Sequence, residues 1–157
     1  GSISAIRGDV EGTNSIIKVK FVVTSAIGGE EIDLTPPNTT DDTAPDPDAN
    51  AGAQSVMIIS YSDMNQSISD TDWTIDFIGK TNGDFILDAD EKAEVTVWLH
   101  DYDGTDYNLG TTANTMYLTT RLGISTKFRV EVKPQEGSVL VLERTTPPRL
   151  QPIIELN

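Results

Sequence analysis

The chain has 157 residues, with 25 acidic and 11 basic side chains, a net charge of −14, one histidine and no cysteine. A surface this acidic repels phosphate backbones and anionic lipids, so nucleic acid and membrane surfaces are excluded as partners. The lack of cysteine excludes disulfides, thiolate metal ligands and cysteine nucleophiles, and no stretch approaches the roughly 20 apolar residues of a membrane span.

The start of the chain, Gly1-Ser2, has the form of a cloning scar. Residues 3–157 are enough for a single domain, which at this size buries roughly two thirds of the surface of its unfolded chain. Arg7-Gly8-Asp9 matches the integrin-binding tripeptide. Because this tripeptide also occurs by chance in many proteins, we interpret it as a turn.

The first strong strand signal is at residues 16–25, where β-branched and aromatic residues alternate with polar ones. Gly28-Gly29 is typical of a turn, and residues 31–35 form a short return strand. The acidic Pro/Asp-rich segment at about 35–54 follows, and its residues 35–53 include four prolines, six Asp or Asn positions and no large apolar residue. This composition predicts a solvated loop or hairpin tip.

Further strand patterns follow, each bounded by Gly, Pro, Asn or Asp, and windows with helical periodicity are scarce. The expected strands are residues 55–62, 73–79, 93–100, 127–133 and 138–145. Seven or so short strands with turn signals between them predict an all-β fold, an antiparallel immunoglobulin-like β-sandwich. In the strand at 93–100, Trp98 lies on the face opposite Val95 and Val97. The pattern leaves open whether Trp98 belongs to the core or to another surface.

The last strand pair is a regular hairpin over residues 128–148. Phe128, Val130 and Val132 share one face, which we assign to the core, while charged residues alternate on the other face. Pro147-Pro148 ends this ladder, and residues 150–157 are expected to follow it as an apolar tail.

Several of these segments together resemble the archaellins, the archaeal flagellins. The matching stretches are RGDVEG, IKVKFVVTSAIGGEEIDLT, NGDFILDADEKAEVTVWL and FRVEVKPQEGSVLVLERTTP. The most specific part is V-K-P-x-x-G, followed by an apolar strand and E-R-T-x-P. The resemblance implies a filament subunit in which a hydrophobic N-terminal helix forms the filament core and a β-sandwich coats it. Compared with such a subunit, the 157-residue chain starts near the beginning of the β domain.

A dense group of oxygen ligands occurs after the strand at 93–100. It consists of Asp101, Asp103, Asp106 and Asn108, a set that suits Ca²⁺ or Mg²⁺. The spacing does not match an EF-hand, so a solvated acidic turn stays the alternative to a metal site. Two other acidic groups are interpreted without a metal. Asp41, Asp42, Asp46 and Asp48 belong to the loop, and Asp84, Asp88, Asp90 and Glu91 form the turn of a strand pair.

Two asparagines, Asn38 and Asn65, start N-x-S/T sequons in stretches that are expected to be surface loops. The resemblance favours glycosylation because archaellins are commonly glycosylated, and the alternative is an unused sequon.

The sequence contains few residues that would indicate catalysis. The single histidine, His100, adjoins Asp101 on an expected strand, where neighbouring side chains point to opposite faces. We therefore expect no enzymatic activity.

The sequence predicts a structural subunit of the archaeal flagellum (archaellum) filament, an outer domain around a core of N-terminal helices, used for motility. Its partners would be other archaellin subunits outside the cell, with no nucleic acid or membrane partner. The isolated chain is expected to be monomeric because it is highly charged and lacks the hydrophobic helix. The alternative function is a Ca²⁺-dependent cell-surface adhesion or binding module.

Overall fold

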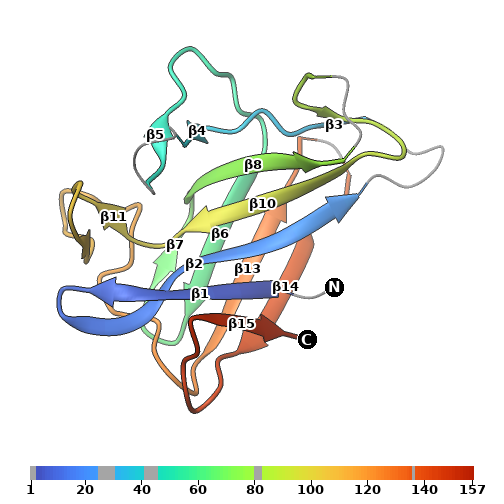
Figure 1. Cartoon of the computed structure of the whole chain (residues 1–157). Coiled ribbons are helices and arrows are strands. Elements are labelled where there is room, and N and C mark those ends of the chain that lie inside the picture. Colours follow the sequence, from blue (N-terminus) through green and yellow to red (C-terminus); the bar gives the residue numbers. More distant parts are fainter. Residues whose placement is uncertain (1–2, 25–30, 41–45, 80–82, 136) are drawn as a thin grey trace.

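The computed structural model describes residues 3–24, 31–40, 46–79, 83–135 and 137–157 (Figure 1). Two antiparallel-rich sheets face each other as a sandwich, which confirms the predicted fold class. The seven-stranded sheet has the order β11-β12-β1-β2-β10-β8, and β15 also pairs with β1. Its strands are β1 (Ile3–Val10), β2 (Thr13–Thr24), β8 (Asp72–Ile78), β10 (Lys92–Trp98), β11 (Asp101–Tyr102), β12 (Tyr107–Asn108) and β15 (Ile153–Leu156).

The second sheet has four strands in the order β14-β13-β6-β7. They are β6 (Ile58–Asp63), β7 (Ser67–Ile68), β13 (Lys127–Lys133) and β14 (Leu140–Thr145). Two small ribbons complete the fold, β3 (Ile32–Asp33) with β9 (Ile86–Leu87) and β4 (Asn38–Thr39) with β5 (Asp48–Ala49). The described part of the chain contains no helix with the length and hydrophobicity needed to span a lipid bilayer.

The core lies between the two sheets and follows the two-residue period of the strands. On β13, Phe128, Val130 and Val132 are at most 4% exposed, which confirms the predicted inward face of the hairpin. Phe128 stacks on Tyr61 of β6 with 6.1 Å between the ring centroids. Opposite them, the larger sheet contributes buried residues, among them Val95 of β10 and Trp73 of the edge strand β8, both at 0% exposure.

The acidic segment at about 35–54 contains the β4-β5 ribbon, as a hairpin tip was expected there. Asp46 and Asp48 lie within it, whereas Asp41 and Asp42 are outside the described residues, as are Gly1-Ser2 and the expected Gly28-Gly29 turn. The acidic residues from Asp84 to Glu91 connect β8 to its partner β10 through β9, as expected for a strand-pair connection.

Two predictions about the ends of the chain are wrong. Arg7-Gly8-Asp9 is not a turn, because it lies inside β1, where Arg7 pairs with Ile16. A register shift between Ile6 and Arg7 interrupts the alternation that would have indicated a strand. Glycine is needed at position 8, since a Cβ there would lie 2.8 Å from the side chain of Ile17.

The expected apolar tail also forms a strand. Pro147-Pro148 does follow the end of β14, but residues 153–156 then return as β15 along β1. Ile154 and Leu156 face inward and are 7% and 8% exposed, while Ile153 and Glu155 point outward. Two alternating pairs are too short a pattern to separate a strand from a tail, and the pairing with β1 is what orders them.

Trp98 lies on the outer face of the larger sheet. It therefore does not belong to the core between the two sheets. Its indole is nevertheless only 3% exposed. The ammonium of Lys18 lies 4.5 Å from the ring centroid, and Nε1 donates a hydrogen bond of 3.1 Å to Thr74 Oγ1. Lys18 of β2 and Thr74 of β8 therefore contact this tryptophan on the outer face of the sheet.

Candidate functional site

The predicted cation ligands occupy the small β11-β12 hairpin. Asp101 pairs directly with Asn108, and Asp103 and Asp106 lie in the turn between them. Asp103 Oδ1 accepts hydrogen bonds from the backbone N–H groups of Thr105 and Asp106, at 2.8 and 2.7 Å. Its Oδ2 accepts a 2.9 Å hydrogen bond from Asn108 Nδ2. The fold thus places the four residues on one hairpin, where Asp106 and Asn108 donate to Asp103. It does not bring ligand oxygens of Asp101, Asp103 and Asp106 all within 4.8 Å of one another.

In this turn, N–H donors stabilise the negative charge of Asp103. Hydrogen bonds from Asp106 and Asn108, followed by that from Thr105, lower the pKa of Asp103 below its usual value. A Ca²⁺ site instead needs oxygen atoms pointing at one centre. Here the side-chain nitrogen of Asn108, not its oxygen, faces Asp103. Binding of a cation would require the amide of Asn108 to rotate and the carboxylate of Asp103 to give up its hydrogen bonds from N–H groups. The cation site stays a prediction.

A second carboxylate group was not predicted as a site. Among the described residues, Asp84, Asp88 and Glu91 form the one group of three or more such side chains with ligand atoms within 4.8 Å of one another. Glu91 is 5% exposed, and its Oε1 accepts a 2.8 Å hydrogen bond from the backbone N–H of Asp88. Glu91 lies between β9 and β10, and its burial results from the fold, so the sequence gives no signal for it.

The two sequons differ in accessibility. Asn65 is exposed, in the turn after β6, where its backbone N–H donates to Asp63 Oδ1 at 2.7 Å. Asn38 is 7% exposed, and its Oδ1 accepts a 3.2 Å hydrogen bond from the backbone N–H of Trp73. The expectation that Asn38 lies in a surface loop is therefore wrong, whereas glycosylation of either residue stays a prediction.

His100 is buried at the end of β10, next to the acidic hairpin. Its Nδ1 lies 3.2 Å from the backbone oxygen of Asn108, and its Nε2 has no hydrogen-bond partner within the described part of the chain. Burial, assisted by the charge of Arg121, lowers the pKa of His100 to about 4. With 0% exposure, the ring is held in the interior, where no substrate can contact it.

Asp72 and Tyr117 form a buried polar pair that the sequence analysis missed. The phenol of Tyr117 donates a hydrogen bond to Asp72 Oδ2 across 45 positions of sequence. Both residues are at most 7% exposed, and burial raises the pKa of both groups. The pair attaches the connection between β12 and β13 to the edge strand β8.

These observations define an all-β sandwich domain whose polar groups maintain turns and strand edges. The sequence model of the archaeal-type flagellin family matches residues 2–144. The chain belongs to this family and is a structural subunit of the extracellular archaeal flagellum filament, which it forms with other archaellin subunits.

Solved structures support the same fold. The chain is similar to the archaeal flagellin FlaB1 from Methanocaldococcus jannaschii, with a TM-score of 0.64 and 13% identity, over 99% of this chain and 93% of that one. It is also similar to the archaeal flagellum of Methanospirillum hungatei strain JF1, with a TM-score of 0.54 and 16% identity. That match covers 96% of this chain and 64% of the other. No curated protein sequence matches the chain.

Proposed function

We propose that this chain is the outer domain of the filament subunit and that it coats a core of N-terminal helices without any catalytic role. The observation that carries the proposal is the family match over residues 2–144, which runs from β1 almost to the end of β14 and leaves out β15. The geometry is compatible with it. The start of β1 lies between β2 and β15, and Ile3 pairs with Leu156 near the chain end, so a preceding helix would leave the sandwich at the end of the larger sheet where both termini lie (Figure 1).

The burial of the single histidine supports the proposal that the domain has no catalytic role. His100 is enclosed, and burial lowers its pKa to about 4, so it is poorly suited to proton transfer at neutral pH. We further propose that Asn65, which is exposed, is the better glycan acceptor of the two sequons. Peptide mass spectrometry of filaments from the source cells would measure the occupancy of each asparagine.

The filament function is tested in the source archaeon with the full-length protein. Antibodies raised against the 157-residue domain should label filaments along their whole length, and deletion of the gene should remove the filaments and swimming. Complementation with the intact gene controls for effects on neighbouring genes. Labelling confined to the cell envelope, with filaments unchanged in the deletion strain, would contradict the proposal and favour an adhesion module.

A further inference from the structure

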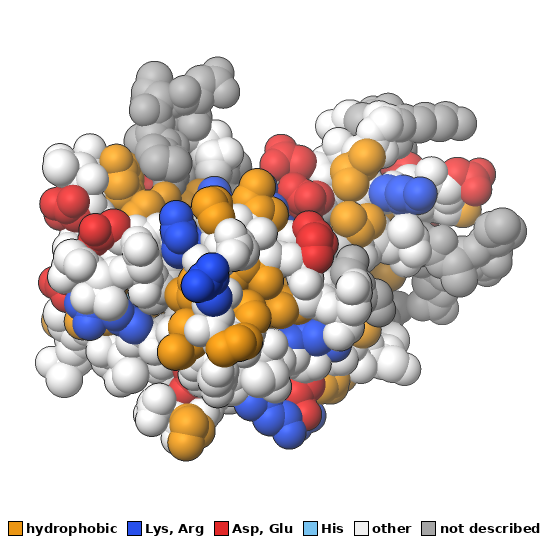
Figure 2. Space-filling model, turned by 60° about the horizontal axis from the view of Figure 1, so that its bottom comes forward, with side chains coloured by type: hydrophobic (Ala, Val, Ile, Leu, Met, Phe, Trp, Pro, Cys, Tyr) orange, Lys and Arg blue, Asp and Glu red, His pale blue; other side chains and the backbone are white. Residues whose placement is uncertain are grey.

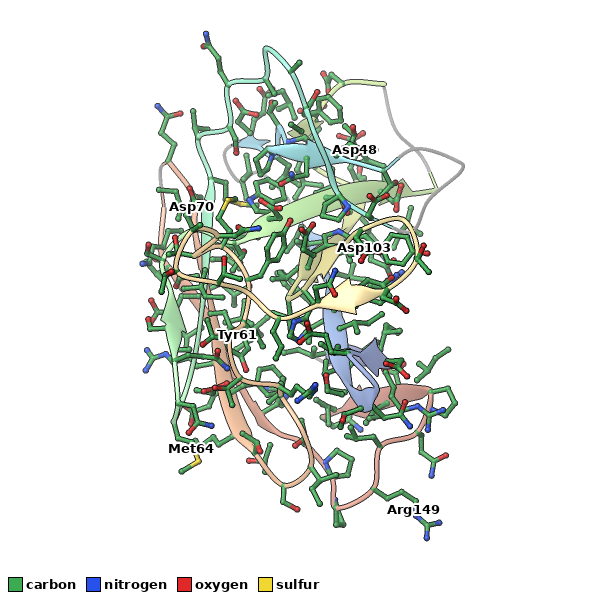
Figure 3. All side chains as sticks on the ribbon, turned by 90° about the vertical axis from the view of Figure 1, so that its left-hand side faces the viewer. Asp48, Tyr61, Met64, Asp70, Asp103 and Arg149 are labelled. Atoms are coloured by element: carbon green, nitrogen blue, oxygen red, sulfur yellow. The ribbon has the colours of Figure 1, made fainter. Side chains whose placement is uncertain are left out.

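The negative charge of the chain is concentrated in one segment. Residues 31–108 contain 18 acidic and two basic side chains, a net charge of −16. Residues 121–157 contain six basic and four acidic side chains, a net charge of +2. Figure 3 shows Asp48, from the first segment, at one end of the molecule and Arg149, from the second, at the opposite end. These two side chains of opposite charge therefore lie at opposite ends of the sandwich, while Met64, also from the first segment, lies towards the Arg149 end.

The end near Arg149 combines positive charge with an exposed aliphatic side chain. We name Arg7, Arg149 and Ile153 the cationic tip. Arg7 holds the segment between Arg149 and Ile153 in place. Its Nη1 donates a hydrogen bond to Leu150 O and its backbone N–H donates one to Pro152 O, both at 3.0 Å. Ile153 is 65% exposed, and residues 144–154 contain two arginines between Glu143 and Glu155. Glu155 points outward on the same strand face as Ile153 and accepts a 2.8 Å hydrogen bond from Ser4 Oγ. Figure 2 looks onto this end and shows hydrophobic side chains grouped beside Lys and Arg.

An apolar cavity lies at the other end of the sandwich. On β13 and β14, Lys127 pairs with Thr145 near the cationic tip, while Val132 pairs with Leu140 at the far end. There a cavity of about 140 Å³ is lined mainly by Ile32, Leu34, Met57, Leu87, Val132 and Leu140. Leu140 is 41% exposed, so the cavity is open to the surface. An apolar cavity of about 150 Å³ can hold a molecule as large as benzene, so one branched aliphatic side chain fits.

The rim of this cavity is acidic. Glu31 and Asp33 flank Ile32 on β3, and the three residues line an adjoining hollow together with Pro134. We name the cavity and these two carboxylates the acidic cavity. Glu31 is exposed, and Asp33 is oriented by hydrogen bonds from Thr35 to its Oδ1, at 2.6 and 2.9 Å. An apolar centre with a negative rim is complementary to an exposed isoleucine beside arginines.

We propose that the cationic tip of one copy of this domain docks into the acidic cavity of a second copy. Ile153 enters the cavity, and Arg149 lies against Glu31 and Asp33. The contact joins two different surfaces, so it is head-to-tail and repeats along an open polymer. The inference rests on the proposed filament function. A second copy is the occupant favoured by charge, since copies of net charge −14 repel one another except where a cationic surface meets an acidic one.

The 157-residue chain has no cysteine, so engineered cysteines report the contact without background. The folded domain carrying both Ile153→Cys and Glu31→Cys, treated with diamide, should form a ladder of dimers, trimers and higher oligomers on a non-reducing gel. An equimolar mixture of the two single variants should stop at dimers. The matched control replaces Ile153→Cys by Val141→Cys, because Val141 is 43% exposed on β14 but lies outside both surfaces. This control should give at least tenfold less cross-linking.

The charge contribution is tested on the same background. Arg149→Glu in the double-cysteine variant should slow cross-linking severalfold, whereas Arg149→Lys should retain it. Ile153→Cys homodimers as abundant as mixed dimers would show a two-fold contact and overturn the proposal. Yields no higher than those of the Val141→Cys control would also overturn it, as expected if the cavity holds a small apolar ligand instead. Antibody-labelled filaments without cross-linking would leave the filament function standing and exclude only this contact.

Discussion

Tyr117 donates a hydrogen bond to the carboxylate of Asp72, and both side chains are almost completely shielded from solvent. Burial raises the pKa of Asp72 above its usual value of 3.8, although the hydrogen bond from Tyr117 opposes this effect. The phenol therefore stabilises a carboxylate in surroundings that disfavour its charge. Removing the phenol should leave that charge with less compensation.

Tyr117→Phe should lower the free energy of unfolding at neutral pH by about 1–3 kcal/mol, the usual cost of leaving a buried polar group without its partner. The loss should shrink as the pH falls through the raised pKa of Asp72, because protonation removes the buried charge. Urea denaturation across this pH range measures both effects. Asp72→Asn is the control, since an uncharged side chain at this position should make the effect of Tyr117→Phe independent of pH. A cost that is the same at every pH in the wild-type background would contradict the assignment.

The sequence predicted those parts of the fold that follow a two-residue period. The alternation at Phe128, Val130 and Val132 is uninterrupted, and the strand prediction for 127–133 agrees with β13. In β1 the alternation is broken by the register shift between Ile6 and Arg7, so the sequence pattern did not predict this strand. β15 has too few residues for its period to be recognised, and only pairing with β1 specifies it.

The candidate sites were predictable only where the residues are close in sequence. Asp103 and Asn108 are five positions apart and do meet in one turn, but their hydrogen-bond geometry cannot be read from spacing. Asn38 has the sequon pattern, yet its burial results from a contact with Trp73 on a distant strand. Contacts of this kind depend on the packing of the sheets, which single-sequence patterns do not encode.

The inward face of the terminal hairpin gives a second prediction. Val130→Asp would place a carboxylate at a site of 0% exposure, at a cost of several kcal/mol. Arg129→Asp would remove an exposed ion pair, in which Arg129 Nη2 lies 2.9 Å from Glu131 Oε1, and should change stability by less than about 1 kcal/mol. Thermal melts of the two variants should therefore differ sharply. Similar melting temperatures would show that the two faces are exchanged.

His100 provides a third prediction, with the sign set by burial. Its pKa falls from 6.5 to about 4 in the folded state, so protons bind preferentially to the unfolded chain. The stability due to neutral His100 is present above pH 6.5 and is lost as the pH falls through 4. Relative to His100→Gln, the wild type should lose up to about 3 kcal/mol over this window. Parallel stability curves for the two proteins would contradict this expectation.

The predicted cation site at Asp101, Asp103, Asp106 and Asn108 can be tested by thermal melting. If a cation binds there, millimolar Ca²⁺ or Mg²⁺ should raise the melting temperature more than NaCl of equal ionic strength, which only screens charge. The expected gain is about 2.7 kcal/mol when free metal is a hundredfold above its dissociation constant. Asp103→Asn should abolish the metal-specific part of the response. It keeps a side-chain oxygen that can accept the hydrogen bonds from Thr105 and Asp106, so the turn itself should persist.

Asp88→Asn is the matched variant in this experiment, because Asp88 belongs to the other acidic group, with Asp84 and Glu91. Wild type and Asp88→Asn should respond alike to Ca²⁺, since this substitution lies outside the β11-β12 hairpin. If Asp103→Asn also responds like the wild type, the hairpin is a solvated acidic turn stabilised by its own N–H donors. If Asp88→Asn alone loses the response, the cation binds between β9 and β10, and the ligand assignment made from the sequence is wrong.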